Sequence, residues 1–404
     1  MPEEWGIKPI KHIFGAIGSG TTPDSSKVEY YDGNINWLQS GDLYKKDYVY
    51  AVSKTITDLG YRSSASLRIY QAPFLAIAMY GASIGNLAIS KIDACVNQAV
   101  AVLKGEENIV RFAKLALEIS KTELIFAAQG GTQPNINQVL IKNWVIPFPS
   151  EIEIKKIADF LDKKVAQLDK VKSLLEEQIK TLEDYRQSLI YETVTKGLDK
   201  NAPLKEVANQ WIGVIPSDWE ERKLRYLAQT RNEKIVTKNS DSYVGLENIT
   251  PKTGLYIETE SEVDLTENIS FKQGDILFGK LRPYLRKFWK AEFDGTASSE
   301  FIVFKESILE LEFLYWAIQS DSFVNDVNSS TYGSKMPRAS WEYIKEIKIP
   351  FPVSQNEQKF IVKFLNEKVV QINQMIAIKK EQIKNINKQR QTLIYDVVTG
   401  KRRV

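Results

Sequence analysis

Apolar residues recur at every seventh position in two long segments of the chain. In the first segment these are Leu161, Leu168, Leu175, Leu182 and Leu189, with Ala158, Val165, Lys172, Ile179 and Arg186 three positions before them. In the second they are Leu365, Ile372, Lys379, Ile386 and Leu393, with Val362, Val369, Ile376, Ile383 and Arg390 three positions before them. Alternating spacings of three and four are typical of a coiled-coil seam. The pattern therefore predicts two long helices that each bury one stripe against a partner.

The predicted helices cover residues 151–197 and 353–404, and the second ends in a basic tail. No proline or glycine interrupts them before Gly197 and Gly400, which are residues that end helices. Ser354, three residues before Glu357, has the form of a capping box. About 45 residues at ~1.5 Å per residue give a rod of roughly 68 Å.

Three partners are open to such a helix: the other segment, a second molecule, or a different protein. Residues 151–200 hold 10 Lys/Arg and 11 Asp/Glu, whereas residues 354–404 hold 11 and 4. A near-neutral helix and a basic one repel each other less than two basic ones, which favours pairing within the chain. The predicted interface residues are Leu161, Leu168, Leu175, Leu182, Leu189, Leu365, Ile372, Ile376, Ile383 and Leu393. The alternative is that each helix packs only on its own globular domain.

The long segments belong to a tandem repeat of half the chain. "IPFPSE" at 146–151 returns as "IPFPVS" at 349–354, 203 positions later. "YRQSLIYETVTKG" at 185–197 is answered by "KQRQTLIYDVVTG" at 388–400. A repeat of this length points to two copies of one architecture related by a pseudo-two-fold axis. Such an axis perpendicular to the helices makes them antiparallel.

The remaining blocks, residues 1–150 and 215–352, have the pattern of mixed α/β domains. Short alternating or continuous apolar runs such as "PFLAIAMY" and "EFIVFK" are separated by Gly, Asn, Asp and Thr. Short helices are expected at 109–118 and 308–320. Residues 198–214 read as a linker. The apolar run at 72–89 is broken by Gly81, Ser83, Gly85 and Asn86, so it predicts two strands around a turn rather than a membrane span.

Composition narrows the chemistry. Of 404 residues, 43% are hydrophobic and 26% charged, as in soluble globular proteins. The single cysteine, Cys95, allows no internal disulfide, and together with His12, the single histidine, it rules out a His/Cys metal site. Neither a G-x-x-x-x-G-K-[ST] phosphate loop nor an Asn/Asp-Pro-Pro-aromatic methylation motif occurs. We expect a cytoplasmic protein without a signal peptide, metal or catalytic centre.

One stretch of the second block is rich in basic and aromatic residues. Residues 271–290, "FKQGDILFGKLRPYLRKFWK", carry six Lys/Arg against one acid, with Tyr284, Phe288 and Trp289 between them. This composition suits contact with phosphates and DNA grooves. The alternative is that this stretch is a solvent-exposed edge of the domain whose lysines extend into water and bind nothing. The loop 332–340 adds Lys335 and Arg338, whereas its counterpart 129–138 is uncharged and rich in Gln and Asn. Asn and Gln suit adenine edges, and Arg and Lys suit guanine.

These features together resemble the specificity subunit of type I restriction–modification systems. The resemblance rests on "WLQSGDL", on "GDILFGKLRPYLRK…SSEFIVF", on the twice-written "IPFP" leading into "LIY..VTG", and on the connector "GLDKNAPLKE…WIGVIPSDWE". It implies two target-recognition domains that each bind half of a split, asymmetric sequence in double-stranded DNA. It also implies two adenine methyltransferase subunits using S-adenosylmethionine and restriction/translocase subunits using ATP and Mg²⁺, so this chain itself would bind no cofactor.

The resulting fold prediction is α/β (α+β), with two similar DNA-recognition domains joined by an antiparallel intramolecular coiled coil. The predicted DNA contacts of the first domain are Ser19, Thr21, Ser83, Gln98, Gln133 and Asn135. Those of the second are Lys280, Arg282, Tyr284, Arg286, Lys287, Ser299, Lys335 and Arg338. Two other functions stay open: a coiled-coil scaffold holding two protein-binding domains, and a nuclease or methylase in its own right.

Overall fold

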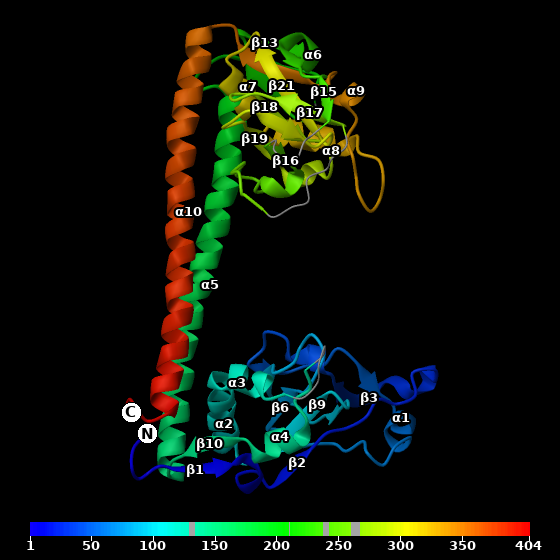
Figure 1. The fold of residues 1–404 in the computed structure, drawn as a ribbon, viewed down its shortest axis with the longest axis vertical. Coiled ribbons are helices and arrows are strands. Elements are labelled where there is room, and N and C mark those ends of the chain that lie inside the picture. Colours follow the sequence, from blue (N-terminus) through cyan, green and yellow to red (C-terminus); the bar gives the residue numbers. More distant parts are fainter. Residues whose placement is uncertain (129–133, 210, 237–241, 260–266) are drawn as a thin grey trace. The chain divides into compact units, whose positions relative to one another are not determined.

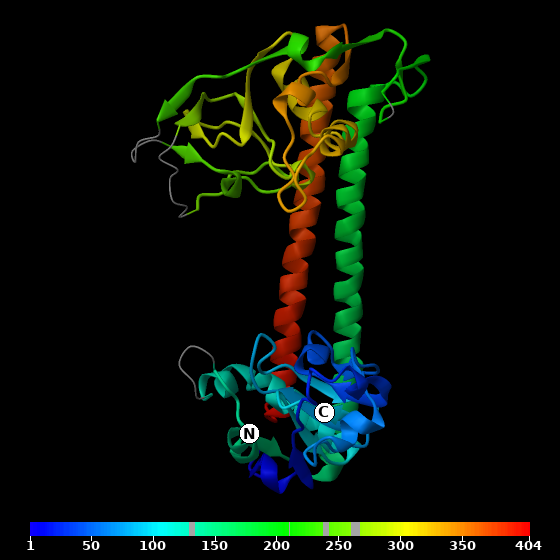
Figure 2. The same cartoon turned by 90° about the vertical axis from the view of Figure 1, so that its right-hand side faces the viewer.

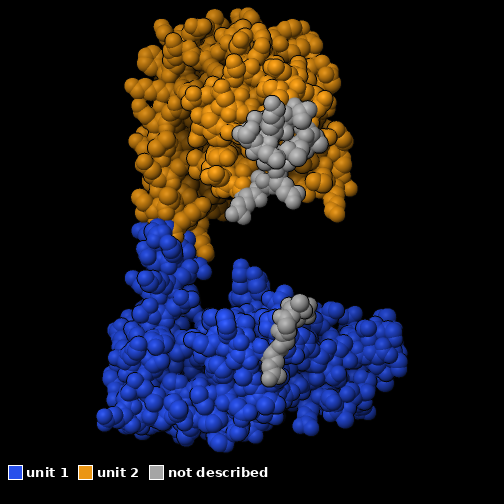
Figure 3. Space-filling view, in the orientation of Figure 1, with its two compact units in different colours: residues 1–175, 381–404 blue, residues 176–380 orange. Residues whose placement is uncertain are grey.

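A computed structural model describes residues 1–128, 134–209, 211–236, 242–259 and 267–404. The chain divides into two compact units, residues 1–175 with 381–404 (unit 1) and residues 176–380 (unit 2) (Figure 3). Both contain helices and strands, so the predicted mixed α/β class is confirmed. Within the described ranges, no helix combines the length and apolar character needed to cross a membrane.

Unit 1 is built on a five-stranded sheet whose central strands are buried apolar runs. The strand order is β2 (Ala16–Gly18), β9 (Val100–Lys104), β6 (Phe74–Ala78), β7 (Leu87–Ser90) and β4 (Tyr48–Val49). β6 and β7 form the antiparallel pair expected of residues 72–89. Helix α2 (Glu107–Ile119) packs on β6 and β7 and includes the helix predicted at 109–118.

Smaller elements complete unit 1. A second sheet has the order β5 (Thr55–Ile56), β3 (Tyr31–Leu38) and β8 (Cys95–Val96), and β1 (Gly6–Pro9) pairs with β10 (Val145–Phe148). The short helices are α1 (Asp58–Arg62), α3 (Lys121–Phe126) and α4 (Gln138–Asn143). The pairing of β1 with β10 brings the start of the chain next to the first long helix, because only two residues separate the end of β10 from the beginning of that helix.

Unit 2 repeats this plan. One four-stranded sheet has the order β14 (Ala228–Thr230), β21 (Phe301–Ser307), β18 (Ile276–Gly279) and β19 (Phe288–Lys290). A second sheet has the order β15 (Lys234–Val236), β17 (Glu267–Phe271), β20 (Gly295–Ala297) and β16 (Tyr243–Val244). Strand β13 (Trp219–Lys223) pairs with β22 (Lys348–Pro352) as β1 does with β10, and β11 (Leu204–Glu206) pairs with β12 (Val214–Pro216). The short helices are α6 (Leu224–Leu227), α7 (Leu311–Ala317), α8 (Asp321–Ser329) and α9 (Trp341–Ile344), of which α7 lies within the helix predicted at 308–320.

Two helices are much longer than the rest: α5 (Glu151–Lys196) and α10 (Gln355–Val398). Both are followed by glycines at positive φ, Gly197 (+75°) and Gly400 (+71°), where other residues are strained. The backbone N–H groups of Glu153 and Glu357 lie 3.4 Å from the hydroxyl oxygens of Ser150 and Ser354. Side-chain caps therefore satisfy a donor in the first turn of each helix.

Within each unit, portions of α5 and α10 contact each other in opposite chain directions (Figures 1 and 2). In unit 1, Glu153 pairs with Arg403 at 3.2 Å and Asp169 with Arg390 at 3.6 Å. In unit 2, Arg186 donates to Asn373 at 2.5 Å, and Lys379 donates to Gln178 at 2.6 Å. In both units the residue number falls along α10, or along the tail that follows it at Arg403, as the α5 number rises.

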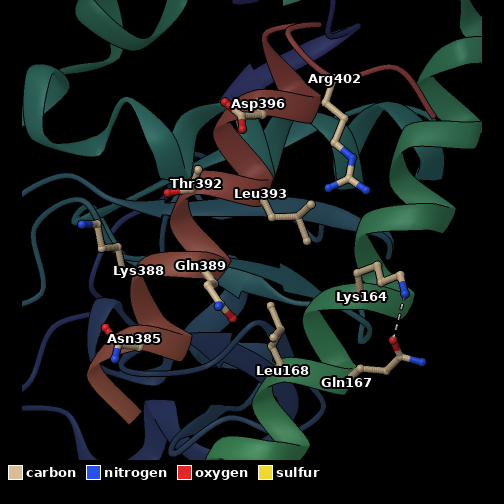
Figure 4. Close-up of a pocket in the computed structure, with 10 residues that line it drawn as sticks. All are labelled: Lys164, Gln167, Leu168, Asn385, Lys388, Gln389, Thr392, Leu393, Asp396 and Arg402. Carbon is tan, nitrogen blue, oxygen red and sulfur yellow. Dashed lines mark hydrogen bonds between the residues drawn. The ribbon is translucent and has the colours of Figure 1, made fainter. Parts of the chain in front are cut away.

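None of the predicted interface residues is exposed. Leu161, Leu365, Ile372 and Ile376 are buried, and the others are half-buried: Leu168, Leu175, Leu182, Leu189, Ile383 and Leu393. Leu168 and Leu393 line a groove of about 680 Å³ between α5 and α10 in unit 1 (Figure 4). Lys164, Lys388 and Arg402 also line it, against one acid, Asp396. The seam is thus less tightly covered here than at Leu161.

A tryptophan joins the ends of the long helices to the domain in each unit. Trp5 Nε1 donates to Glu153 of α5 at 3.4 Å, and Trp219 Nε1 donates to Glu357 of α10 at 3.0 Å. Gly400 and Gly197 approach the same two rings, since a Cβ on either would lie 3.1–3.2 Å from the ring carbons. Each tryptophan therefore contacts the beginning of one long helix and the end of the other.

Candidate nucleic-acid interface

In unit 2, three segments far apart in sequence meet at the end of strand β18. The backbone N–H of Lys280 donates to the carbonyl of Glu300 at 2.8 Å, and its own carbonyl accepts from Ala339 at 3.0 Å. Arg338 forms antiparallel bridges with both Leu281 and Tyr332. The loop 332–339 is thus held along residues 280–282 by backbone hydrogen bonds, which gives its side chains a fixed platform.

Two arginines on this platform have left-handed backbones. Arg282 (φ +51°) and Arg286 (φ +55°) flank the single turn Pro283–Leu285. Such φ values are uncommon for residues other than glycine and persist only where the surroundings hold them. The Nε of Arg282 is buried without a hydrogen-bond partner among the described residues, and its Nη2 lies 3.4 Å from the carbonyl of Lys335. Leaving a buried donor without an acceptor is unfavourable, so the surroundings hold Arg282 in this position at a cost in stability.

Arg286 and Lys287 are engaged within the protein. Arg286 pairs with Asp321 on α8 and donates to Gln187 of α5 at 2.7 Å. The Lys287 ammonium donates to the carbonyl of Leu246 at 2.6 Å, and burial lowers its pKa. This placement favours an anchoring role for both side chains. Their contact with DNA stays a prediction, as does that of the exposed Tyr284, Ser299 and Lys335.

Lys280 and Arg338 lie together next to one carboxylate. Arg338 Nε donates to Glu300 Oε2 at 2.9 Å, and its Nη2 pairs with Oε1 of the same residue. The ammonium of Lys280 has no hydrogen-bond or ion-pair partner in the described part of the chain. Burial lowers the pKa of Lys280, and the charge of Arg338 lowers it further. Glu300 pairs with Arg338 alone, so no acid of the described residues neutralises Lys280 and the site keeps a local excess of positive charge.

The candidates of unit 1 gather at the matching end of its sheet. Gln138 donates to the hydroxyl of Ser19 at 2.7 Å, and Thr22, next to Thr21, donates to Gln98 at 2.6 Å. Ser83 lies in the turn between β6 and β7, and Asn135 precedes α4. The remaining candidate, Gln133, lies outside the described residues. Five polar candidates from four segments are thus brought to one edge of the domain.

Unit 1 has a platform like that of unit 2, and backbone hydrogen bonds define which residues of the two correspond. Met79 donates to the carbonyl of Ala99 and accepts from Ile136, both at 2.8 Å, as Lys280 does with Glu300 and Ala339. Met79 therefore corresponds to Lys280, Ala99 to Glu300, and Asn135 to Arg338. The two frameworks are alike, yet these positions are uncharged in unit 1 and charged in unit 2.

Sequence reasoning missed Glu300 and the two tryptophans. Glu300 has no recognisable signal in the sequence, because it is a lone acid after "SS" and its partner Arg338 is 38 residues away. Trp5 lies in "PEEWGIKPIKHI" (2–13) and Trp219 in "WIGVIPSDWEERKL" (211–224); these two stretches resemble each other faintly, and that resemblance is a signal by which the tryptophans could have been found. A search of the described residues finds no group of His, Cys, Asp and Glu suited to a metal ion.

Comparison with known proteins identifies the family. The family described as "Type I restriction modification DNA specificity domain" matches twice, at residues 2–183 and 216–388. The type I restriction enzyme MjaVIII specificity subunit of Methanocaldococcus jannaschii is 23% identical over 307 residues, which is 72% of this chain and 69% of that one. The putative MjaX specificity subunit of the same organism is also 23% identical, over 100% of this chain and 95% of that one.

Solved structures share the fold. A chain from work on complex assembly and conformational transition of the type I R-M system aligns with a TM-score of 0.72 at 12% identity, covering 98% of both chains. The crystal structure of the HsdS subunit from Thermoanaerobacter tengcongensis aligns with a TM-score of 0.54 at 14% identity, covering 99% of this chain and 98% of that one. With two tandem matches that together span most of its residues, the chain belongs to the family of type I restriction–modification specificity subunits.

Proposed function

We propose that this chain recognises a split, asymmetric DNA sequence and directs partner enzymes to it. Each globular domain, residues 1–150 and 215–352, reads one half of the target. The observation that carries the proposal is the duplicated platform, on which equivalent backbone hydrogen bonds hold different side chains at Met79 and Lys280. One scaffold with two sets of side chains is what two readers of different sequences require.

The long helices serve as the spacer between the readers. Contacts in both units run antiparallel and the predicted seam is covered, which supports a single antiparallel coiled coil formed by residues 151–197 and 353–404, with 198–214 as linker. The contacts between α5 and α10 are antiparallel in both units, which supports a pseudo-two-fold relation between the two readers.

Chemistry is assigned to partners rather than to this chain. Two adenine methyltransferase subunits would bind S-adenosylmethionine, and restriction/translocase subunits would bind ATP and Mg²⁺. The sequence has neither a phosphate loop nor a methylation motif, which supports a non-catalytic role, and the single cysteine supports a reducing cytoplasm. The competing function is a scaffold for two protein-binding domains; the six Lys/Arg against one acid in residues 271–290 favour DNA.

Duplex binding at several salt concentrations tests the proposal. A DNA reader binds with an affinity whose logarithm falls linearly with the logarithm of salt concentration, because phosphate contacts release counterions. Binding without this dependence, or no binding, would support the scaffold. Methyl transfer by the purified chain alone would instead show an enzyme. Sequencing methylated bases in cells with and without the gene should reveal one split motif that disappears.

A further inference from the structure

The platform of unit 2 holds an arginine in a fixed orientation. Glu300 accepts two donors of the Arg338 guanidinium. Among the described residues, the Nη1 group and one Nη2 hydrogen of Arg338 have no other acceptor. The backbone of Arg338 is itself fixed, because it pairs with Tyr332 and Leu281 on its two sides. A guanidinium held by a carboxylate loses little conformational freedom on binding, so its remaining donors can discriminate between acceptors.

The adjacent lysine adds a second donor to the same place. Residues 280 and 339 are hydrogen-bonded neighbours, so Lys280 stands next to Arg338 in space. Its ammonium is half-buried, and neither an acid nor a carbonyl of the described chain accepts from it. Desolvating a cation beside another cation is unfavourable unless acceptors arrive from outside. The site therefore has unused donors and a need for acceptors.

We propose that Arg338, positioned by Glu300, and Lys280 read a guanine in the half-site of the second domain. This inference rests on the proposed function and deepens it by assigning a base. Guanine presents two acceptors, O6 and N7, in the major groove, and arginine or lysine donors match that pair. A phosphate would need only a mobile exposed cation, whereas Arg338 is oriented by Glu300 and Lys280 is partly desolvated. Glu300 acts as a positioning residue, because its role is exerted through Arg338.

The first domain supplies natural control residues for the test. Lys280→Met, Glu300→Ala and Arg338→Asn each install the residue found at the corresponding position of unit 1, where the same backbone framework accepts it. Lys272→Ala removes a positive charge from the opposite end of β18, where the side chain is exposed. Comparing the four variants separates loss of a base contact from loss of charge.

The experiment selects duplexes from a randomised pool with the full-length chain and sequences the bound fraction. The wild type should prefer guanine at one position of one half-site. Lys280→Met and Arg338→Asn should each weaken that preference on the order of 10- to 100-fold and leave the other half-site unchanged. Glu300→Ala should weaken it without changing the melting temperature or the salt dependence. Lys272→Ala should preserve every base preference.

Three results would overturn the inference. One is a selected half-site without guanine; another is unchanged preference in all three platform variants. The third is a uniform loss of affinity for every sequence with a shallower salt dependence, which marks a phosphate contact. Absence of salt-dependent binding in the wild type would instead refute the proposed function, so the two failures are distinguishable.

Discussion

At the scale of single residues, two substitutions at Arg282 separate the strain of its left-handed backbone from the contribution of its guanidinium to DNA binding. Alanine at φ +51° keeps the backbone strain, whereas glycine removes it. We expect Arg282→Gly to have a free energy of unfolding about 1 kcal/mol greater than Arg282→Ala. Both should weaken duplex binding by the second domain equally, because both lack the guanidinium. Chemical denaturation and duplex titration measure the two effects, and full affinity in either variant would show that Arg282 does not contact DNA.

The same stretch shows how far residues could be assigned from sequence. The composition of 271–290 indicated a basic platform, but Arg282 and Arg286 looked equivalent there. Their difference depends on tertiary contacts, since Arg286 donates to Gln187 and pairs with Asp321. The spacing of basic residues within 271–290 gives no information about these two partners of Arg286, which lie 35 and 99 residues away in the sequence. Charge was therefore predictable, and the direction of each side chain was not.

At the scale of elements, the contact of Gly197 with Trp219 explains how the end of α5 is held. Gly197 and Gly213 both have φ +75°, but only Gly197 faces a ring, whose carbon would lie 3.2 Å from an added Cβ. Gly197→Ala and Gly213→Ala should therefore share the same backbone strain. We expect Gly197→Ala to be further destabilised by about 1 kcal/mol through overpacking. Equal free energies of unfolding for the two variants would show that this contact contributes nothing.

The two arginines at matching seam positions provide a second test between elements. Arg390 lies near the carboxylates of Glu118 (2.5 Å), Asp169 (3.6 Å) and Asp47 (3.9 Å), which joins α10 to α5 and to the domain. Arg186 donates to Asn373, and its buried Nε has no partner among the described residues. Arg390→Met should cost about 2–4 kcal/mol by leaving carboxylates unpaired, whereas Arg186→Met should cost less than about 1 kcal/mol.

Denaturant unfolding of both methionine variants measures that difference, and a larger loss for Arg186→Met would contradict it. The heptad pattern identified both arginines as seam residues because helix periodicity is local. It could not distinguish them, because Glu118 and Asp47, which pair with Arg390, come from the globular domain, whereas Arg186 donates to Asn373 of α10. In the same way the long helices were predicted to within a few residues, whereas the pairing of Phe74 with Lys104 in the sheet depends on segments that only folding brings together.

At the scale of the whole molecule, the duplication predicts the result of replacing one reader with the other. Strands β1 with β10 and β13 with β22 enter and leave the two domains in the same way, and Trp5 and Trp219 make the same bond to the adjoining helix. A chain in which residues 1–150 also replace 215–352 should therefore fold. Because the proposed coiled coil is antiparallel, its readers would face DNA in opposite orientations.

The chimera should accordingly recognise one half-site twice, as an inverted repeat, in place of the asymmetric target. Sequencing methylated bases in cells that express it with the partner methyltransferase would reveal the motif. A direct repeat would refute the two-fold relation while leaving the domains as readers. An unchanged asymmetric motif would show that sequence is read elsewhere, because both domains of the chimera are identical. The orientation of the repeat thus tests whether the two long helices are antiparallel, and the base sequence of the repeat tests whether the domains read the DNA.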